Sequence, residues 1–178
     1  MKLLLLRTQI LNELINNDIQ TLLFEFDSIW IKNPLPLLRS YDNSTDMLCV
    51  KNLKNPGTIN GGFIYFFPTL STRGVLQKML DMSYTLFITF SRLRLDCKLP
   101  TGDNDQEILS RLIMTKYRNI HVVILDYFDF ADGIWYDMKY EQRIYIEPYV
   151  IHNDYIIGNN AKILRFKAYG HWFVNESG

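Results

Sequence analysis

Two carboxylates stand two residues apart at the end of an apolar run near the start of the chain. The run at 22–24 has the composition of a buried strand, and Glu25 and Asp27 follow it directly. Residues i and i+2 of a strand share a face, so the two acids point the same way, repel each other and are costly to desolvate. A divalent cation resolves this conflict because hard cations bind carboxylate oxygens. The alternative is that the strand has ended and water solvates both acids.

A histidine near the other end of the chain could complete such a metal site. His152 directly follows the apolar residues 149–151, which are predicted to form a strand. An imidazole combined with carboxylates suits manganese better than calcium. Gly158 would let backbone N–H groups approach a phosphate, and Lys162 would supply a point charge to it. Taken alone, a histidine in this position is more often a structural or surface residue.

Two glycines lead into a strongly β-prone run at 62–67. Asn60, Gly61 and Gly62 stand at its start. Paired glycines at such a position indicate either a turn or a backbone left bare so that a ligand can come close. Both interpretations stay open on the sequence.

The segment 103–106 opens a predicted helix. Asp103 as the N-cap, with Gln106 three residues later, fits a capping box. Alternatively, Asp105 and Gln106 face a pocket at the N-terminus of that helix.

Composition and charge are those of one globular domain. The chain has 178 residues, of which 48% are hydrophobic and 21% charged. Its net charge is zero, so it lacks the excess of positive charge that is typical of nucleic-acid-binding proteins. It has no apolar run long enough to span a membrane and no complete signal peptide. Cys49 and Cys97 are compatible with one disulfide or two free thiols. The glycosylation sequons at Asn43 and Asn175 lean only weakly toward a secretory compartment.

Helical and strand patterns alternate along the chain, which predicts an α/β sheet. We expect helices at 2–17, 71–90 with a polar break near residue 83, 103–117 and 160–173, and strands at 20–26, 46–51, 62–67, 121–125 and 144–151. We expect the strands near 21–26, 62–67 and 121–125 to be central and buried, the first of them with an exposed flank.

The motifs, taken in their order from about residue 20 to 172, resemble those of the nucleotide-diphospho-sugar transferases. This is a family of glycosyltransferases of GT-A fold related to plant cell-wall pentosyl- and galactosyltransferases. It has an acidic D-x-D-type motif followed by Trp and Asn/Asp-Pro, an Asn-x-Gly-Phe strand, an Asp-Gln pair, a Phe-x-x-Gly and a His-Asn, Gly, Lys element. The matching stretches here are Glu25-Phe26-Asp27 with Trp30 and Asn33-Pro34, Asn60-Gly61-Gly62-Phe63, Asp105-Gln106, Phe130-Ala131-Asp132-Gly133, and His152-Asn153 with Gly158, Lys162 and Trp172.

The resemblance implies a metal-dependent enzyme that moves a sugar from a nucleotide-diphospho-sugar donor to a glycan or protein-linked acceptor. It implies retention of the anomeric configuration and a place in the Golgi or secretory lumen. The metal would be Mn²⁺, with Mg²⁺ as the alternative. The implied metal ligands, which we expect to converge on one cleft, are Glu25, Asp27 and His152. The implied donor-binding residues are Asn60, Gly61, Gly62, Gly158 and Lys162, and the residues implied to position sugar hydroxyls near the reacting carbon are Asp105 and Gln106.

For residues 1–178 the resemblance implies a single, incomplete GT-A domain, a mixed sheet flanked by helices. The strand–helix–strand units that hold the nucleoside in relatives, and their membrane anchor, are not matched. Glu25 also stands where the family usually has Asp. An alternative function is a non-catalytic remnant that binds a sugar or a partner. A weaker one is a metal-dependent phosphoesterase.

Overall fold

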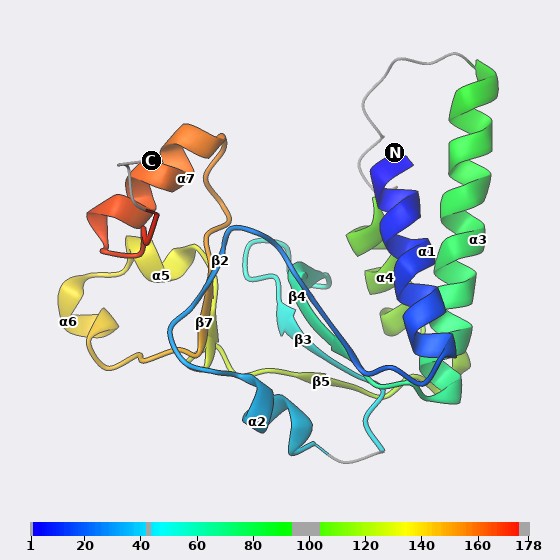
Figure 1. The fold of residues 1–178 in the computed structure, drawn as a ribbon, viewed down its shortest axis with the longest axis horizontal. Coiled ribbons are helices and arrows are strands. Elements are labelled where there is room, and N and C mark those ends of the chain that lie inside the picture. Colours follow the sequence, from blue (N-terminus) through cyan, green and yellow to red (C-terminus); the bar gives the residue numbers. More distant parts are fainter. Residues whose placement is uncertain (1, 42–43, 94–103, 175–178) are drawn as a thin grey trace.

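The computed structural model describes residues 2–41, 44–93 and 104–174. Cys97, the sequons at Asn43 and Asn175, and the predicted N-cap Asp103 lie outside these ranges. The described residues form two mixed β-sheets flanked by helices, which confirms the predicted α/β fold (Figure 1).

The larger sheet has four strands in the order β1-β4-β3-β5. β4 is antiparallel to both of its neighbours, while β5 runs parallel to β3. Every residue of β4 is buried, as expected of an inner strand covered on both faces. The bounds of the four strands are Thr21–Phe24 for β1, Ile59–Phe66 for β4, Met47–Lys51 for β3 and Val122–Ile124 for β5.

The prediction that three strands are central holds for β4 and is wrong for β1 and β5, which form the two edges of the sheet. A short apolar run has the same composition in an edge strand as in a central strand, because its own sequence does not specify which strands pair with it. The exposed flank expected for the first strand is confirmed. Leu22 and Leu23 are half-buried, and the side chain of Phe24 is 44% exposed.

Three helices cover one face of the larger sheet: α1 (Lys2–Asn16), α3 (Leu70–Leu93) and α4 (Asp105–Met114) (Figure 1). Their buried side chains pack with β3 and β4 into one core cluster. Cys49 of β3 lies inside this cluster as a free thiol, and burial raises its pKa to about 12.

Helix α1 has two apolar faces rather than one. Leu5, Leu11 and Ile15 are buried, two of them in the core cluster. The stripe that predicts this helix from the sequence lies on its other side and stays largely exposed; it consists of Leu3, Leu6, Ile10 and Leu14. This second face borders the site described below.

The opposite face of the larger sheet packs against α2 (Leu35–Arg39) and the smaller sheet. That sheet has the order β2-β7-β6, with β2 antiparallel and β6 parallel to β7. Short helices and α7 cover its outer side around Tyr136 (Figure 1). The remaining elements are β2 (Ser28–Trp30), η1 (Tyr117–Asn119), β6 (Phe130–Ala131), α5 (Ile134–Asp137), α6 (Tyr140–Arg143), β7 (Val150–His152) and α7 (Asn159–Ala168).

Several predicted boundaries are wrong. α3 continues without a break near residue 83, because hydroxyls such as those of Thr85 and Thr89 donate to carbonyls one turn back instead of ending the helix. The strand expected at 144–151 is reduced to β7, and α7 ends at Ala168. Asn104 caps α4 by accepting a hydrogen bond from the N–H of Glu107. No helix in the described part of the chain is both long and apolar enough to cross a membrane.

Candidate metal and donor site

Glu25, Asp27 and His152 come together although 125 residues or more separate the acids from the histidine in sequence. One ligand atom from each lies within 4.8 Å of the other two. His152 Nε2 is 3.2 Å from Asp27 Oδ1 and 3.4 Å from Glu25 Oε2. The expected convergence is therefore present, and the role of the three residues as metal ligands stays a prediction.

The backbone explains this convergence. The segment at 25–27 joins β1 of the larger sheet to β2 of the smaller one, and a turn closes it with a hydrogen bond from Ser28 N to Glu25 O. In the pairing of β2 with β7, Ser28 lies opposite His152. The strand register therefore brings the histidine beside the two acids.

The three side chains perturb one another. Burial alone would raise the pKa of Asp27, but contacts with His152 and Lys162 outweigh it and lower that pKa to about 2. Contact with His152 likewise lowers the pKa of Glu25. Burial would lower the pKa of His152, yet contacts with Asp27 and Glu25 raise it to about 9. Without a cation, His152 is therefore protonated at neutral pH, and its positive charge offsets one of the two negative charges of the acids.

A hydrogen-bond network fixes which nitrogen of His152 faces the acids. Asp154 can only accept, so the amide nitrogen of Asn60 donates to it at 2.8 Å. Asn60 Oδ1 then accepts from Gly62 N at 2.9 Å and from His152 Nδ1 at 3.1 Å. Nδ1 thus carries a hydrogen in either charge state, and the neutral ring presents a lone pair at Nε2. That nitrogen is buried, and its closest acidic neighbours among the described residues are the carboxylates of Asp27 and Glu25.

The paired glycines make room for site side chains. A Cβ atom on Gly62 would lie 2.1 Å from His152 Cε1, and one on Gly61 would lie 2.9 Å from Gln106 Oε1. Gly61 N donates to that same oxygen at 3.0 Å. Both glycines lie inside β4 rather than ahead of it. Donor binding by Asn60, Gly61 and Gly62 stays a prediction.

Replacing Gly62 with alanine is expected to lower the free energy of unfolding by about 1–3 kcal/mol, because the buried His152 ring must move. In a His152→Ala background, the same replacement should cost much less, since the obstructing ring is gone. Urea denaturation of the four proteins measures both costs. Equal costs in the two backgrounds would show that Gly62 is not required by the histidine.

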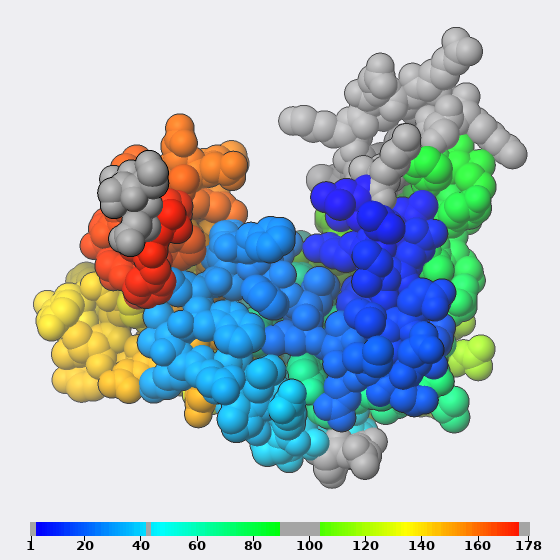
Figure 2. Space-filling view, in the orientation of Figure 1, coloured from blue at the N-terminus to red at the C-terminus, as the bar shows by residue number. Residues whose placement is uncertain are grey.

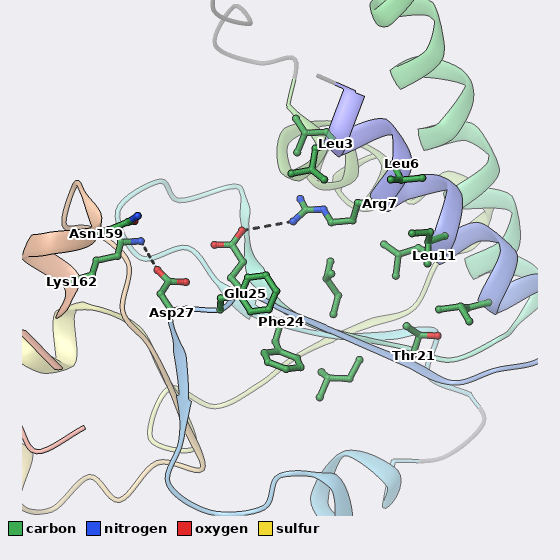
Figure 3. Close-up of a pocket in the computed structure, with 16 residues that line it drawn as sticks. Leu3, Leu6, Arg7, Leu11, Thr21, Phe24, Glu25, Asp27, Asn159 and Lys162 are labelled. Carbon is green, nitrogen blue, oxygen red and sulfur yellow. Dashed lines mark hydrogen bonds and ion pairs between the residues drawn. The ribbon is translucent and has the colours of Figure 1, made fainter. Parts of the chain in front are cut away.

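Arg7 of α1 connects the acidic cluster to the start of α4, and the sequence patterns did not reveal it. Its guanidinium pairs with Asp105, which is buried, and Arg7 Nη1 is 3.8 Å from Glu25 Oε1 (Figure 3). The one sign in the sequence was that Arg7, a charged residue, lies between Leu3 and Ile10 in the apolar stripe of the helix. Asp154, two residues after His152, was also missed.

The N-terminus of α7 lies beside Asp27. Gly158 is the N-cap with a φ of +93°, a conformation that favours glycine, and nothing lies within 4 Å of the Cβ position there. One turn into the helix, Lys162 forms an ion pair with Asp27. The element that carries the predicted phosphate-binding residues therefore reaches the acidic cluster (Figure 3).

A hollow of about 700 Å³ leads along α1 and β1 to these charged groups. Its apolar wall comes from the second face of α1, and its far end is formed by Glu25, Asp27 and Lys162 (Figure 3). In Figure 2 the surface is recessed between α1 and the C-terminal segment. The volume lies within the range of small-molecule sites.

Residues 1–166 match the nucleotide-diphospho-sugar transferase family. The chain belongs to that family. This transferase-family chain is 39% identical over 62 residues to UDP-galactose:fucoside alpha-3-galactosyltransferase of Dictyostelium discoideum, a match that covers 34% of this chain and 10% of that protein.

Among solved structures, the transferase-family chain is similar to mouse xyloside xylosyltransferase 1 in its apo form. The TM-score is 0.49 at 12% sequence identity, over 89% of this chain and 64% of the mouse chain. The chain thus spans about a tenth of the length of the curated relative and less than two thirds of the solved one.

Proposed function

We propose that this chain carries the metal and diphosphate part of a glycosyltransferase site that uses a nucleotide-diphospho-sugar donor. The observation that carries the proposal is the convergence of Glu25, Asp27 and His152 beside Lys162 at the end of a large hollow. Family membership supports sugar transfer in general. Metal dependence and the roles of single residues rest on this geometry.

The side chains of Glu25, Asp27 and His152 suit a divalent cation. Two carboxylates and one imidazole are ligands that manganese accepts, with magnesium as the harder alternative. His152 Nε2 is buried and lies 3.2 Å from Asp27 Oδ1 and 3.4 Å from Glu25 Oε2, so one cation could contact all three side chains. Asn60 holds the other ring nitrogen, as the outer partner of a metal-binding histidine commonly does.

The remaining residues would act on the donor. When bound, the metal would neutralise charge on the diphosphate and so favour its departure from the sugar. Lys162 and the N–H groups at the start of α7 offer positive charge to the same phosphates. Gly61 N–H donates to the side-chain oxygen Oε1 of Gln106. The side-chain NH₂ group of Gln106 is therefore the group that can donate to a sugar hydroxyl. Asp105, next to it, is held by Arg7.

The names of the relatives guide the choice of substrates. One relative is named for UDP-galactose and a fucoside, the other for xyloside xylosylation. We therefore propose UDP-galactose as the first donor to test, with UDP-xylose as a comparison donor and a glycan or protein-linked acceptor. We further propose retention of configuration and action in the Golgi or secretory lumen, both by family resemblance.

Calorimetric titration of UDP-galactose and UDP-xylose, with Mn²⁺ or with EDTA, tests the proposal. Binding should require Mn²⁺, and Lys162→Met should weaken donor binding about tenfold while Mn²⁺ itself still binds. Lys78→Met, at an exposed position on α3, is the matched control. Equal donor binding in EDTA would contradict the proposal. Mn²⁺-dependent binding without transfer to any acceptor would favour a non-catalytic sugar-binding domain.

A further inference from the structure

Asp154 stands two residues after His152, and its two carboxylate oxygens accept hydrogen bonds from two different parts of the fold. Oδ1 accepts from Gly133 N at 2.7 Å, and Oδ2 accepts from the side-chain nitrogen of Asn60 at 2.8 Å. Gly133 is the N-cap residue of α5, which follows β6 of the smaller sheet, whereas Asn60 belongs to β4 of the larger sheet. The side chain of Asp154 therefore joins the two sheets beside His152.

Among amide and carboxyl side chains of this size, only a carboxylate suits both partners of Asp154. Gly133 N–H and the NH₂ group of Asn60 are both donors, so the side chain between them must present an acceptor on each side. An asparagine has one oxygen and one NH₂ group, and it would turn a donor toward one of the two. Asn60 is buried, and an unpaired donor there is costly.

The main chain at Asp154 is held from two sides. Arg165 of α7 donates hydrogen bonds to Asp154 O and to the side-chain oxygen of Asn153. On the other side, a Cβ atom on Gly133 would lie 2.1 Å from Asp154 O, so the two main chains are in close contact. Since Gly133 N–H is also a fixed backbone donor, the side chain of Asn60 is the partner that must adjust to Asp154.

The orientation of Asn60 in turn determines what His152 can do. Asp154 Oδ2 is 3.6 Å from His152 Nδ1, which is beyond hydrogen-bond range, whereas Asn60 Oδ1 is 3.1 Å from that nitrogen. If the Asn60 amide turned over, its NH₂ group would face His152 Nδ1, which would then have to accept. The hydrogen of the neutral ring would sit on Nε2, and that nitrogen would have no lone pair for a cation.

We propose that Asp154 is a positioning residue for the predicted metal ligand His152. It holds the Asn60 amide in the orientation that keeps a hydrogen on Nδ1 and leaves Nε2 to the cation. Outer hydrogen-bond partners of this kind commonly change metal affinity by tenfold or more. The effect of Asp154 on metal binding rests on the proposed function, whereas its effect on the imidazole ring does not.

Exchanging the two side chains tests this role. Asp154→Asn keeps its oxygen on Gly133 N–H and turns a donor toward the NH₂ group of Asn60, which should make the Asn60 amide turn over. Asn60→Asp alone places two carboxylates against each other. In the double variant Asn60→Asp/Asp154→Asn the carboxylate and the amide have changed places, so every donor again faces an acceptor and the total charge is that of the wild type.

Calorimetry with Mn²⁺ should show at least about tenfold weaker binding for each single variant, and binding within about threefold of the wild type for the double variant. Asp137→Asn, at an exposed position on α5, is the matched control and should bind Mn²⁺ like the wild type.

Nitrogen-15 NMR of the His152 ring at pH 7 without metal supplies a readout that a loss of stability alone would not change. The hydrogen on Nδ1 should be protected from exchange with solvent in the wild type and in the double variant, and unprotected in Asp154→Asn. Thermal denaturation shows whether each variant is folded. If Asp154→Asn does not fold, Asp154→Ala removes both acceptors without adding a donor, and it should also speed the exchange of this hydrogen.

The outcomes separate this proposal from the proposed function. A wild type that binds no Mn²⁺, but whose Nδ1 hydrogen responds to the variants as expected, would contradict the metal site and support the role of Asp154. An Nδ1 hydrogen that stays protected in Asp154→Asn and Asp154→Ala would overturn that role, even if Mn²⁺ binds to the wild type. A folded double variant that binds Mn²⁺ no better than the single variants would also overturn it.

Discussion

Replacing Asp27 with asparagine is expected to weaken Mn²⁺ binding by at least about a hundredfold. Asparagine keeps the size of the side chain, so the loss comes from the charge. Asp27 is the acid closest to His152 Nε2 and it also pairs with Lys162. The neutral side chain would leave Lys162 as an uncompensated positive charge next to the cation, which adds repulsion to the lost bond.

Calorimetry or the Mn²⁺ electron paramagnetic resonance signal of free metal measures this affinity directly. Glu147→Gln removes one carboxylate at an exposed position and is the matched control. It should bind Mn²⁺ like the wild type. If Asp27→Asn also binds Mn²⁺ like the wild type, the cluster of Glu25, Asp27 and His152 is not a metal site.

Mn²⁺ affinity is expected to rise about tenfold for each pH unit up to about pH 9 and then level off. The pKa of His152 is about 9 without metal, so at neutral pH a cation must displace its proton. The two acids keep their charge over this range, because the pKa of Asp27 is about 2 and that of Glu25 is also lowered. One proton should therefore leave for each Mn²⁺ bound at pH 7.

Calorimetry in buffers of different ionisation enthalpy counts the released protons. His121→Gln, which removes another histidine outside the cluster, should leave the count unchanged. His152→Gln should abolish both the release and the pH dependence. Metal binding by the wild type that is independent of pH between 6 and 9 would show that His152 is not a ligand.

The stability of the metal-free protein should fall as the pH rises, whereas its Mn²⁺ affinity should increase. His152 has a higher pKa in the folded than in the unfolded chain, where it is about 6.5. Its contribution to stability is therefore complete below pH 6.5 and is lost as the pH rises through 9. Urea denaturation at several pH values in EDTA measures this loss.

The positions of the acids and of the histidine were predictable because each directly follows an apolar run. A strand end is visible in sequence as a change from apolar to polar residues, and Glu25, Asp27 and His152 all stand at such changes. What the sequence could not give was the strand pairing that places them together. Ser28 lies opposite His152 because β2 pairs with β7 in one particular register. The sequence of neither strand alone determines that register.

The faces of α1 and the role of Arg7 were not predicted, because they too depend on tertiary contacts. The helix over residues 2–16 follows from its period, but Leu5 and Leu11 face the core while Leu3 and Leu6 do not, since both faces are apolar. Arg7 is hidden within one of these stripes, and its partner Asp105 is nearly a hundred residues away. Whether a polar residue serves a distant side chain is decided by tertiary contacts.

The segment at 25–27 is held by the backbones of both sheets. The N–H of Glu25 donates to Gly62 O at 3.0 Å, and the N–H of Asn153 donates to Asp27 O at 2.8 Å. These two amides should therefore exchange their hydrogens with solvent only when the junction between the sheets opens. A ligand that joins Glu25, Asp27 and His152 would slow both exchange rates by the same factor. The junction would then open as one cooperative unit, with two residues from opposite ends of the chain reporting the same event.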